Sequence, residues 1–149
     1  MAYFVNKVYK KTSSVTLYQL LAGAHAWFEK GLMEAFRKKK MPPLGKADLN
    51  LLANLNCGST YSSELAKRLG VTRQAVTKLL RNLIELELVK LETVPERRNT
   101  KEIVITPKGQ DIIMAAVDEL NRLEKKLAKQ IGKEKASALR DALECDWNA

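Results

Sequence analysis

Hydrophobic residues recur every three or four positions towards both ends of the chain, and this spacing is typical of helices that bury one face. The first of these helices is predicted to be capped by Ser13 or Ser14 and to reach about Lys40. The second long helix is predicted to begin at Thr106-Pro107, where a capping hydroxyl precedes a proline. A last amphipathic helix is predicted over residues 133–145. One small lobe cannot cover such long apolar stripes, which indicates a partner subunit. The stripes contain Leu17, Leu20, Leu21, Ala24, Phe28, Leu32 and Phe36, then Ile113, Ala116, Leu120, Leu123, Leu127 and Ile131.

The middle of the chain predicts three shorter helices separated by turn residues. Residues 41–45 contain two prolines and a glycine, which end the first long helix. Gly58 and Gly70 can adopt the left-handed conformation that closes a helix. We expect Thr60 or Ser62 to cap the second of the three short helices and Thr72 to cap the third. The first of the three helices spans about residues 47–56 and has Leu49, Leu52 and Leu55 as its apolar face. The second spans residues 62–69, and the third extends from Thr72 to about Glu87.

A hairpin is predicted directly after these helices. Residues 88–92 and 102–105 are β-branched and alternating, which is typical of strands, and residues 95–100 form a polar turn between them. Arg97, Arg98 and Lys101 give this hairpin a basic tip. A helix, a turn and a helix followed by a hairpin is the order of a winged helix-turn-helix. The predicted fold is therefore mostly α with a small β-hairpin wing.

The helix that begins at Thr72 has two chemically different faces. Val76, Leu79, Leu80, Leu83 and Ile84 share the face that must meet a core, while polar side chains share the opposite one. Glutamine can bond adenine, arginine and lysine can bond guanine, and threonine can touch a thymine methyl group or a phosphate. An ordinary solvated helix face would show the same pattern, but the helix-turn-helix before it and the basic hairpin after it favour DNA reading. The candidate reading residues are Arg73, Gln74, Thr77, Lys78 and Arg81.

Composition supports a polyanionic partner and offers no enzyme chemistry. The chain has 26 Lys and Arg against 17 Asp and Glu, a net charge of +9, and the excess lies in residues 1–110. One histidine and two distant cysteines, Cys57 and Cys145, make neither a catalytic triad, a zinc knuckle nor a disulfide framework. We expect no catalytic residue, no metal and no cofactor. No segment is predicted to span a membrane or to act as a secretory signal, so we expect a cytoplasmic protein.

The segment from Ser63 to Leu80, SELAKRLGVTRQAVTKLL, resembles the MarR family of bacterial and archaeal regulators. The segments Leu86-Glu87-Leu88-Val89 and Ile105-Thr106-Pro107-Lys108-Gly109 also resemble this family, and the resemblance extends over about residues 14–145. It implies one MarR-like domain over residues 1–149, with dimerisation helices at about 13–45 and 107–149 and a DNA-binding lobe at about 47–106. Ser62 and Ser63, at the start of the first helix of the helix-turn-helix, and Thr72, directly before the second, join the DNA-binding candidates.

The resemblance also implies a function and a mechanism. It implies a homodimeric transcriptional regulator, expected to be a repressor, which binds a pseudo-palindromic double-stranded DNA site and is released by a small apolar or aromatic effector. His25, Trp27 and Met114 are candidates for lining the effector pocket, although an interface or core role explains His25 as well. Two alternatives remain open: a winged helix used as a protein-interaction module, and a regulator that senses oxidants through cysteine.

Two positions depart from the family pattern. The family wing usually carries Asp-x-Arg, whereas the nearest match here is Glu96-Arg97-Arg98, one residue further from Thr106 than is usual. The acid normally orients the wing arginine, so the pattern leaves open which of Arg97 and Arg98 enters the minor groove. Glu87 stands where glycine often precedes the first wing strand, which makes that corner less tolerant.

Overall fold

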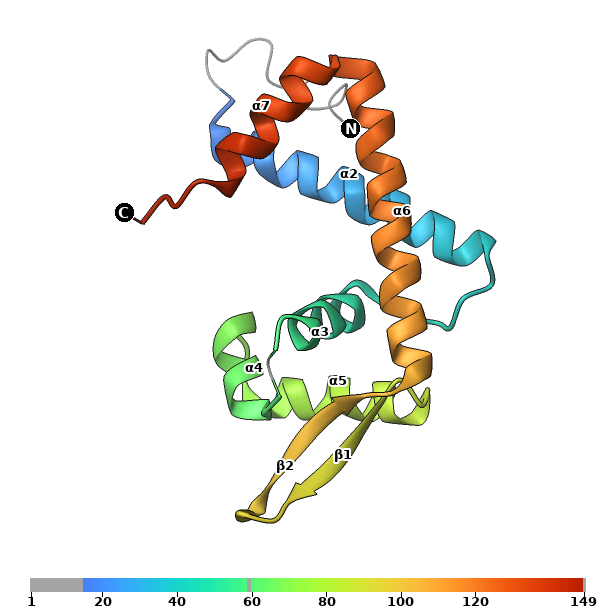
Figure 1. Ribbon diagram of the computed structural model, residues 1–149, viewed down its shortest axis with the longest axis vertical. Coiled ribbons are helices and arrows are strands. Elements are labelled where there is room, and N and C mark those ends of the chain that lie inside the picture. The colour runs from blue at the N-terminus through green and yellow to red at the C-terminus, as the bar shows by residue number, and fades with distance from the viewer. Residues whose placement is uncertain (1–14, 59, 149) are drawn as a thin grey trace. The chain divides into compact units, whose positions relative to one another are not determined.

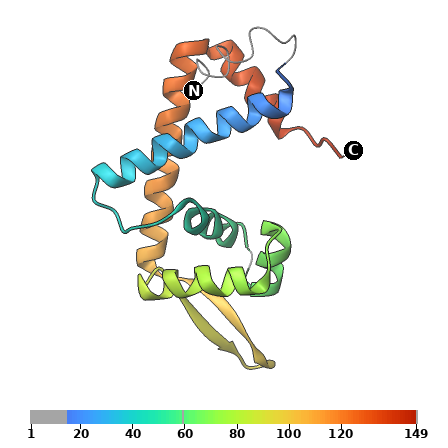
Figure 2. The same ribbon diagram turned by 180° about the vertical axis from the view of Figure 1, so that it is seen from behind.

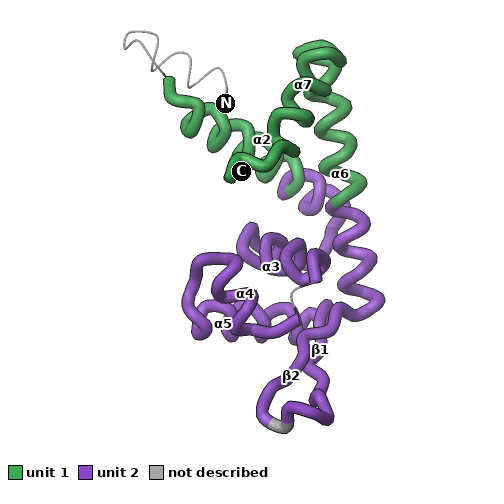
Figure 3. Tube along the Cα trace, turned by 60° about the vertical axis from the view of Figure 1, so that its left-hand side comes forward, with its two compact units in different colours: residues 1–32, 117–149 green, residues 33–116 purple. Residues whose placement is uncertain are grey.

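The computed structural model describes residues 15–58 and 60–148, apart from the side chain of Arg98. It contains six helices and one two-stranded antiparallel sheet in this part of the chain (Figures 1 and 2). Mostly helical architecture with a β-hairpin is therefore confirmed. The chain divides into two compact units, of which unit 1 comprises residues 1–32 and 117–149 and unit 2 comprises residues 33–116 (Figure 3). The elements are α2 (Leu17–Lys38), α3 (Lys46–Asn56), α4 (Ser62–Leu69), α5 (Arg73–Glu85), β1 (Val89–Val94), β2 (Arg97–Ile105), α6 (Pro107–Ile131) and α7 (Lys133–Glu144).

The core of unit 2 is formed where α3, α4 and α5 pack together. Leu65, Val76 and Leu83 are completely buried, one from α4 and two from α5. From α3, Leu51, Leu52 and Leu55 are buried, whereas Leu49 is half-buried. The predicted apolar face of α3 is therefore confirmed at Leu52 and Leu55 and wrong at Leu49. Leu49 and Leu51 flank these two residues on opposite sides of the helix, and periodicity alone does not choose between them.

The hairpin is longer than the sequence pattern indicates. β1 and β2 pair in antiparallel register from Val89 opposite Ile105 to Thr93 opposite Lys101, and a bulge precedes the pairing of Val94 with Arg97. The predicted turn over residues 95–100 was therefore wrong from residue 97 onward, because β2 already begins at Arg97. Backbone pairing holds these polar residues in the strand, and their exposed side chains need not alternate with apolar ones.

Thr106 joins the end of α5, the start of β1 and the start of α6. Its hydroxyl donates to the Glu87 carbonyl oxygen at 2.6 Å and accepts from the Gly109 backbone amide at 3.0 Å. Glu87 has a φ of 60°, the left-handed conformation that glycine adopts more easily. A Cβ atom on Gly109 would lie 2.1 Å from the Leu88 carbonyl oxygen, so only glycine fits this close approach of α6 to the chain before β1.

The structure confirms two of the four predicted helix caps. Thr106 and Thr72 cap α6 and α5 as expected, and the Thr72 hydroxyl accepts from the Ala75 amide at 3.1 Å. At α2, Thr16 and Gln19 bond each other reciprocally, while Ser13 and Ser14 lie outside the described residues. The expectation that Thr60 or Ser62 caps α4 was wrong: Tyr61 is the cap residue, and no side chain caps this helix.

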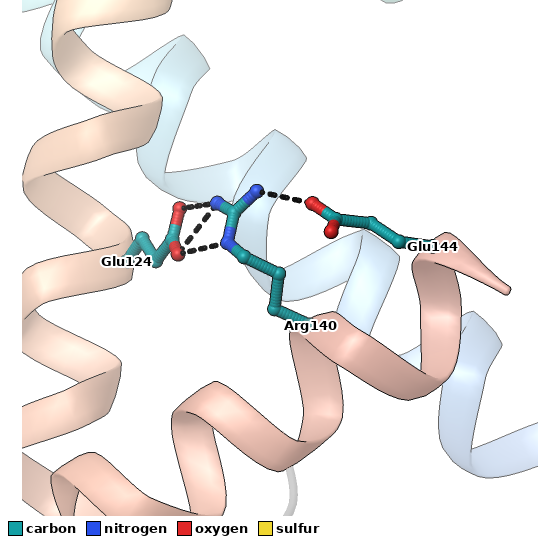
Figure 4. A network of polar contacts seen from close by, with 3 residues as sticks. All are labelled: Glu124, Arg140 and Glu144. Atoms are coloured by element: carbon teal, nitrogen blue, oxygen red, sulfur yellow. Dashed lines mark hydrogen bonds and ion pairs between the residues drawn. The ribbon is translucent and has the colours of Figure 1, made fainter.

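Unit 1 contains most of α2, most of α6 and all of α7. Gly31 on α2 lies against Leu123 on α6, whose methyl carbons would be 2.8 Å from a Cβ atom at that glycine. Arg140 on α7 donates to both carboxylate oxygens of Glu124 on α6, and its Nη1 donates to Glu144 at 3.1 Å (Figure 4). The hydrogen bond to Glu124, and to a smaller extent the one to Glu144, raises the pKa of the Arg140 guanidinium above its ordinary value. The ion pair between Arg140 and Glu124 connects α7 to α6, although no side chain of α7 is buried.

Candidate nucleic-acid interface

Helix α5 presents its predicted polar face to solvent. Val76 and Leu83 are completely buried and Leu80 is 5% exposed, so one face of the helix meets the core of unit 2. Ile84, expected on the same face, is 38% exposed because it lies at the edge of the buried arc. The opposite face carries four exposed polar side chains, Gln74, Thr77, Lys78 and Arg81, and Arg73 is exposed beside them at the start of the helix. The role of these five residues in binding DNA stays a prediction.

The start of α5 is fixed by local hydrogen bonds. The Thr72 hydroxyl accepts from the Ala75 amide, which occupies one of the free donors at the helix start. One turn later, the Thr77 hydroxyl donates to the Arg73 carbonyl oxygen at 2.9 Å. This bond uses the hydroxyl proton of Thr77 within the helix, so an external group meets an acceptor oxygen and a methyl group.

A buried carboxylate attaches α5 to α3. Asp48, in the first turn of α3, is 7% exposed. One of its carboxylate oxygens accepts from the Gly45 amide at 2.9 Å and from the Asn82 side-chain amide at 3.1 Å. Asn82 follows Arg81 on α5, so this bond constrains the rotation of the helix about its own axis. Neither residue stands out in the sequence as a functional candidate.

The hairpin is attached to the segment before α4. The Ile103 amide of β2 donates to the Thr60 carbonyl oxygen at 2.7 Å. The Arg97 guanidinium, at the start of β2, lies 5.6 Å from the centre of the Tyr61 ring, within the range of a cation–π contact. The hairpin is therefore held against the helix-turn-helix at two points, and in both views it projects beyond α5 (Figures 1 and 2).

The other DNA-binding candidates of unit 2 lie at the start of α4 and on the hairpin. Ser62 and Ser63 are half-buried in the first turn of α4. Lys101 is exposed on β2, opposite Thr93. The side chain of Arg98 lies outside the described part of the structure. Their contacts with DNA stay predictions.

The three candidates for an effector pocket fall in different units. In unit 1, the His25 side chain is 75% exposed, with its Nδ1 3.8 Å from a carboxylate oxygen of Glu29. Trp27, in the same unit, packs edge-on against Phe28 with the ring centres 5.0 Å apart. Met114 belongs to unit 2 and is 59% exposed. Their joint pocket stays a prediction.

Cys57 and Cys145 are free, exposed thiols. Over residues 15–58 and 60–148, no three His, Cys, Asp or Glu side chains gather into an arrangement that could hold a metal ion. In the same residues, no helix is both long and apolar enough to cross a membrane.

The chain is similar to a known family and to curated proteins. A model of the MarR family matches residues 49–98, which contain most of α3, all of α4, α5 and β1, and the start of β2. The uncharacterized protein Rv2011c of Mycobacterium tuberculosis is 30% identical over 80 residues, which are 54% of this chain and 56% of that protein. The chain thus matches about half the length of this curated relative.

Solved structures share the fold over most of the chain. Wild-type MarR from E. coli, in its apo form, matches with a TM-score of 0.74 and 19% identity over 89% of this chain and 97% of that one. The MepR–DNA complex of S. aureus matches with a TM-score of 0.66 and 20% identity over 87% and 95%. The transcriptional regulator Tm0710 from Thermotoga maritima matches with a TM-score of 0.63 and 23% identity over 85% of this chain and 88% of that one. The resemblance inferred from the sequence is therefore confirmed.

Proposed function

We propose that this chain, which has the winged helix of the MarR family, is a sequence-specific double-stranded DNA-binding transcriptional regulator and not an enzyme. The exposed polar face of α5 is the observation that carries the proposal, since it opposes a fully buried face and is held by caps and by Asp48. A helix fixed in this way can present its side chains to base edges in the major groove. Because its ligand is DNA, we place the protein in the cytoplasm.

The position of each side chain along α5 assigns its part in this binding. Residues near the start of a recognition helix point most directly at base edges, so Arg73, Gln74, Thr77 and Lys78 specify sequence. Arg81, one turn further along, holds a phosphate. The hairpin residues Arg97, Arg98 and Lys101 contact the flanking backbone or minor groove, and Ser62 and Ser63 contact a phosphate.

Regulation through a dimer completes the proposal. Two copies of α5, about 34 Å apart, would fill successive major grooves of a pseudo-palindromic site. A small apolar or aromatic effector that binds near His25, Trp27 and Met114 would change this spacing and lower the affinity for DNA, as a released repressor requires. A winged helix that binds another protein is the second candidate function. It would be favoured if a salt titration showed no salt-dependent binding to DNA, because phosphate contacts make DNA binding weaken as salt rises.

A folded homodimer is expected at micromolar concentration. Unit 1 exposes several large apolar side chains and contains α7, of which no side chain is buried, so a second copy of this unit would remove apolar area from water. Sedimentation velocity should give the mass of two chains, and a compact monomer would contradict the expectation. The exposed side chains are Leu17, Tyr18, Leu20, Val117, Leu139, Leu143 and Trp147.

Substitutions on α5 separate sequence reading from phosphate binding. Gln74→Ala should relax the preference at one symmetric pair of base positions and leave non-specific binding nearly intact, since a lost base contact is worth roughly 1–3 kcal/mol in each half-site. Arg81→Ala should weaken specific and non-specific binding alike. Each variant is compared with the parent by selecting bound sites from random duplex DNA.

Ile84→Ala provides the matched control, because Ile84 lies on α5 outside the polar face. It should return the parental motif. If Gln74→Ala also returns that motif at full stringency, while a substitution on α2 or α6 changes it, α5 is not the reading helix.

A further inference from the structure

Tyr61 and Arg97 form a contact between the helix-turn-helix and the hairpin. Tyr61 is the cap residue of α4 and is half-buried, whereas Arg97 begins β2 and is exposed. The guanidinium carbon lies 5.6 Å from the ring centre. The backbone bond from the Ile103 amide to the Thr60 carbonyl oxygen attaches the same strand to the segment before α4, six positions along β2 from Arg97.

An aromatic ring holds an arginine differently from a carboxylate. A carboxylate takes up N–H donors of the guanidinium and cancels its charge. A ring attracts the guanidinium through its face, and the charge and the in-plane N–H donors remain available to another group. In the described part of the chain, the guanidinium of Arg97 contacts the ring of Tyr61 and does not pair with the adjacent carboxylate of Glu96. Arg97 is thus positioned and still able to bind an anion.

The place of this contact indicates which anion. Tyr61 directly precedes α4, the first helix of the helix-turn-helix, and that helix crosses the DNA backbone in complexes of this motif. A guanidinium held there meets phosphate oxygens and not the edges of bases at the tip of the hairpin.

We propose that Tyr61 is a positioning residue that holds Arg97 as a phosphate-binding group, and that Arg97 is not the residue that reads the minor groove. This inference rests on the proposed DNA-binding function. It leaves Arg98 to read the minor groove, which the sequence pattern left open between the two arginines.

Three variants test the inference through the salt dependence of duplex binding. Arg97→Ala should weaken binding to all sequences and lower the slope of log K against log salt by about one unit for each subunit that binds. Its selected sites should keep the parental preference for flanking A·T pairs. Tyr61→Leu should also weaken binding, but not when Arg97 is already alanine. Tyr61→Phe, which keeps the ring, should bind as the parent does.

Nuclear magnetic resonance of the free protein reports the contact without DNA. The side-chain protons of Arg97 should be shifted upfield by the ring current of Tyr61, and this shift should persist in Tyr61→Phe and vanish in Tyr61→Leu. Thermal unfolding shows whether each variant is folded, and Arg97→Ala, at an exposed position, tests the phosphate role if Tyr61→Leu does not fold.

Each other outcome overturns a stated part of the account. If Arg97→Ala removes the A·T preference and leaves the salt slope unchanged, Arg97 reads the minor groove. Equal effects of Tyr61→Phe and Tyr61→Leu, or effects of Tyr61→Leu that persist without Arg97, would show that the ring does not position the guanidinium. A parent protein with the upfield shift but no salt-dependent DNA binding would refute the proposed function and the phosphate role, and not the contact.

Discussion

Gly109→Ala is expected to destabilise the protein by about 3 kcal/mol or more, although alanine normally stabilises a helix relative to glycine. The added Cβ atom would lie 2.1 Å from the Leu88 carbonyl oxygen and 2.9 Å from a methyl carbon of Ile105. The nearer atom belongs to the backbone at the start of the hairpin, which cannot rotate away as a side chain can. The start of α6 would have to move, with loss of the Thr106 bonds to Glu87 and Gly109. Thermal or urea unfolding measures the loss.

Two other helical glycines provide controls. Nothing lies within 4 Å of a Cβ atom on Gly23, so Gly23→Ala should stabilise the protein by about 0.5–1 kcal/mol. Gly31→Ala should fall between the two, because its Cβ atom would meet only the end of the Leu123 side chain. If Gly109→Ala is as stable as Gly23→Ala, α6 does not approach the Leu88 carbonyl oxygen as closely as the structure indicates.

A triple substitution on α5, Arg73→Ala with Lys78→Ala and Arg81→Ala, should lower the affinity for a selected duplex by about ten-thousandfold or more. Each lost base or phosphate contact is worth roughly 1–3 kcal/mol, and every contact occurs twice in a dimer. The slope of log K against log salt should fall by about one unit for each phosphate contact removed. Fluorescence anisotropy of a labelled duplex at several salt concentrations measures both quantities. The three side chains are exposed, so the variant should unfold at nearly the parental temperature.

A control triple removes the same charge elsewhere. Lys125, Lys126 and Lys129 are exposed on α6 in unit 1, and their replacement by alanine also lowers the net charge by three. This variant should keep most of the affinity, because the proposal places DNA against α5 and the hairpin. Equal losses in the two triple variants would show that net charge alone governs the binding.

Local rules predicted the helices of unit 2 well. Apolar periodicity and the turn at Gly70 placed α4 over residues 62–69, and the hydroxyl of Thr72 marked the start of α5. The polar face of α5 followed from the same periodicity, because a helix with one fully buried face must expose the other. The hairpin was predicted too short, since the exposed polar strand near Arg97 shows no alternation.

The features that the sequence did not predict depend on contacts between distant residues. Asp48 and Asn82 are 34 positions apart, and neither side chain is unusual for its helix. The position of Asp48 three residues after the cap Gly45 was the available signal for a buried first-turn acid. No local pattern in the sequence marks Tyr61, and its contact with Arg97 appears only in the folded chain, where β2 is attached to Thr60.

The central claim is that two copies of α5 read double-stranded DNA, and selection from random duplex DNA by the full chain tests it most directly. The account predicts an enriched inverted repeat whose half-sites are about one helical turn apart, or a multiple of it. The variant with Arg73, Lys78 and Arg81 replaced should not enrich this repeat, and the control triple on α6 should. Failure of the folded parent to enrich any sequence, or enrichment of the same repeat by the α5 variant, would contradict the account.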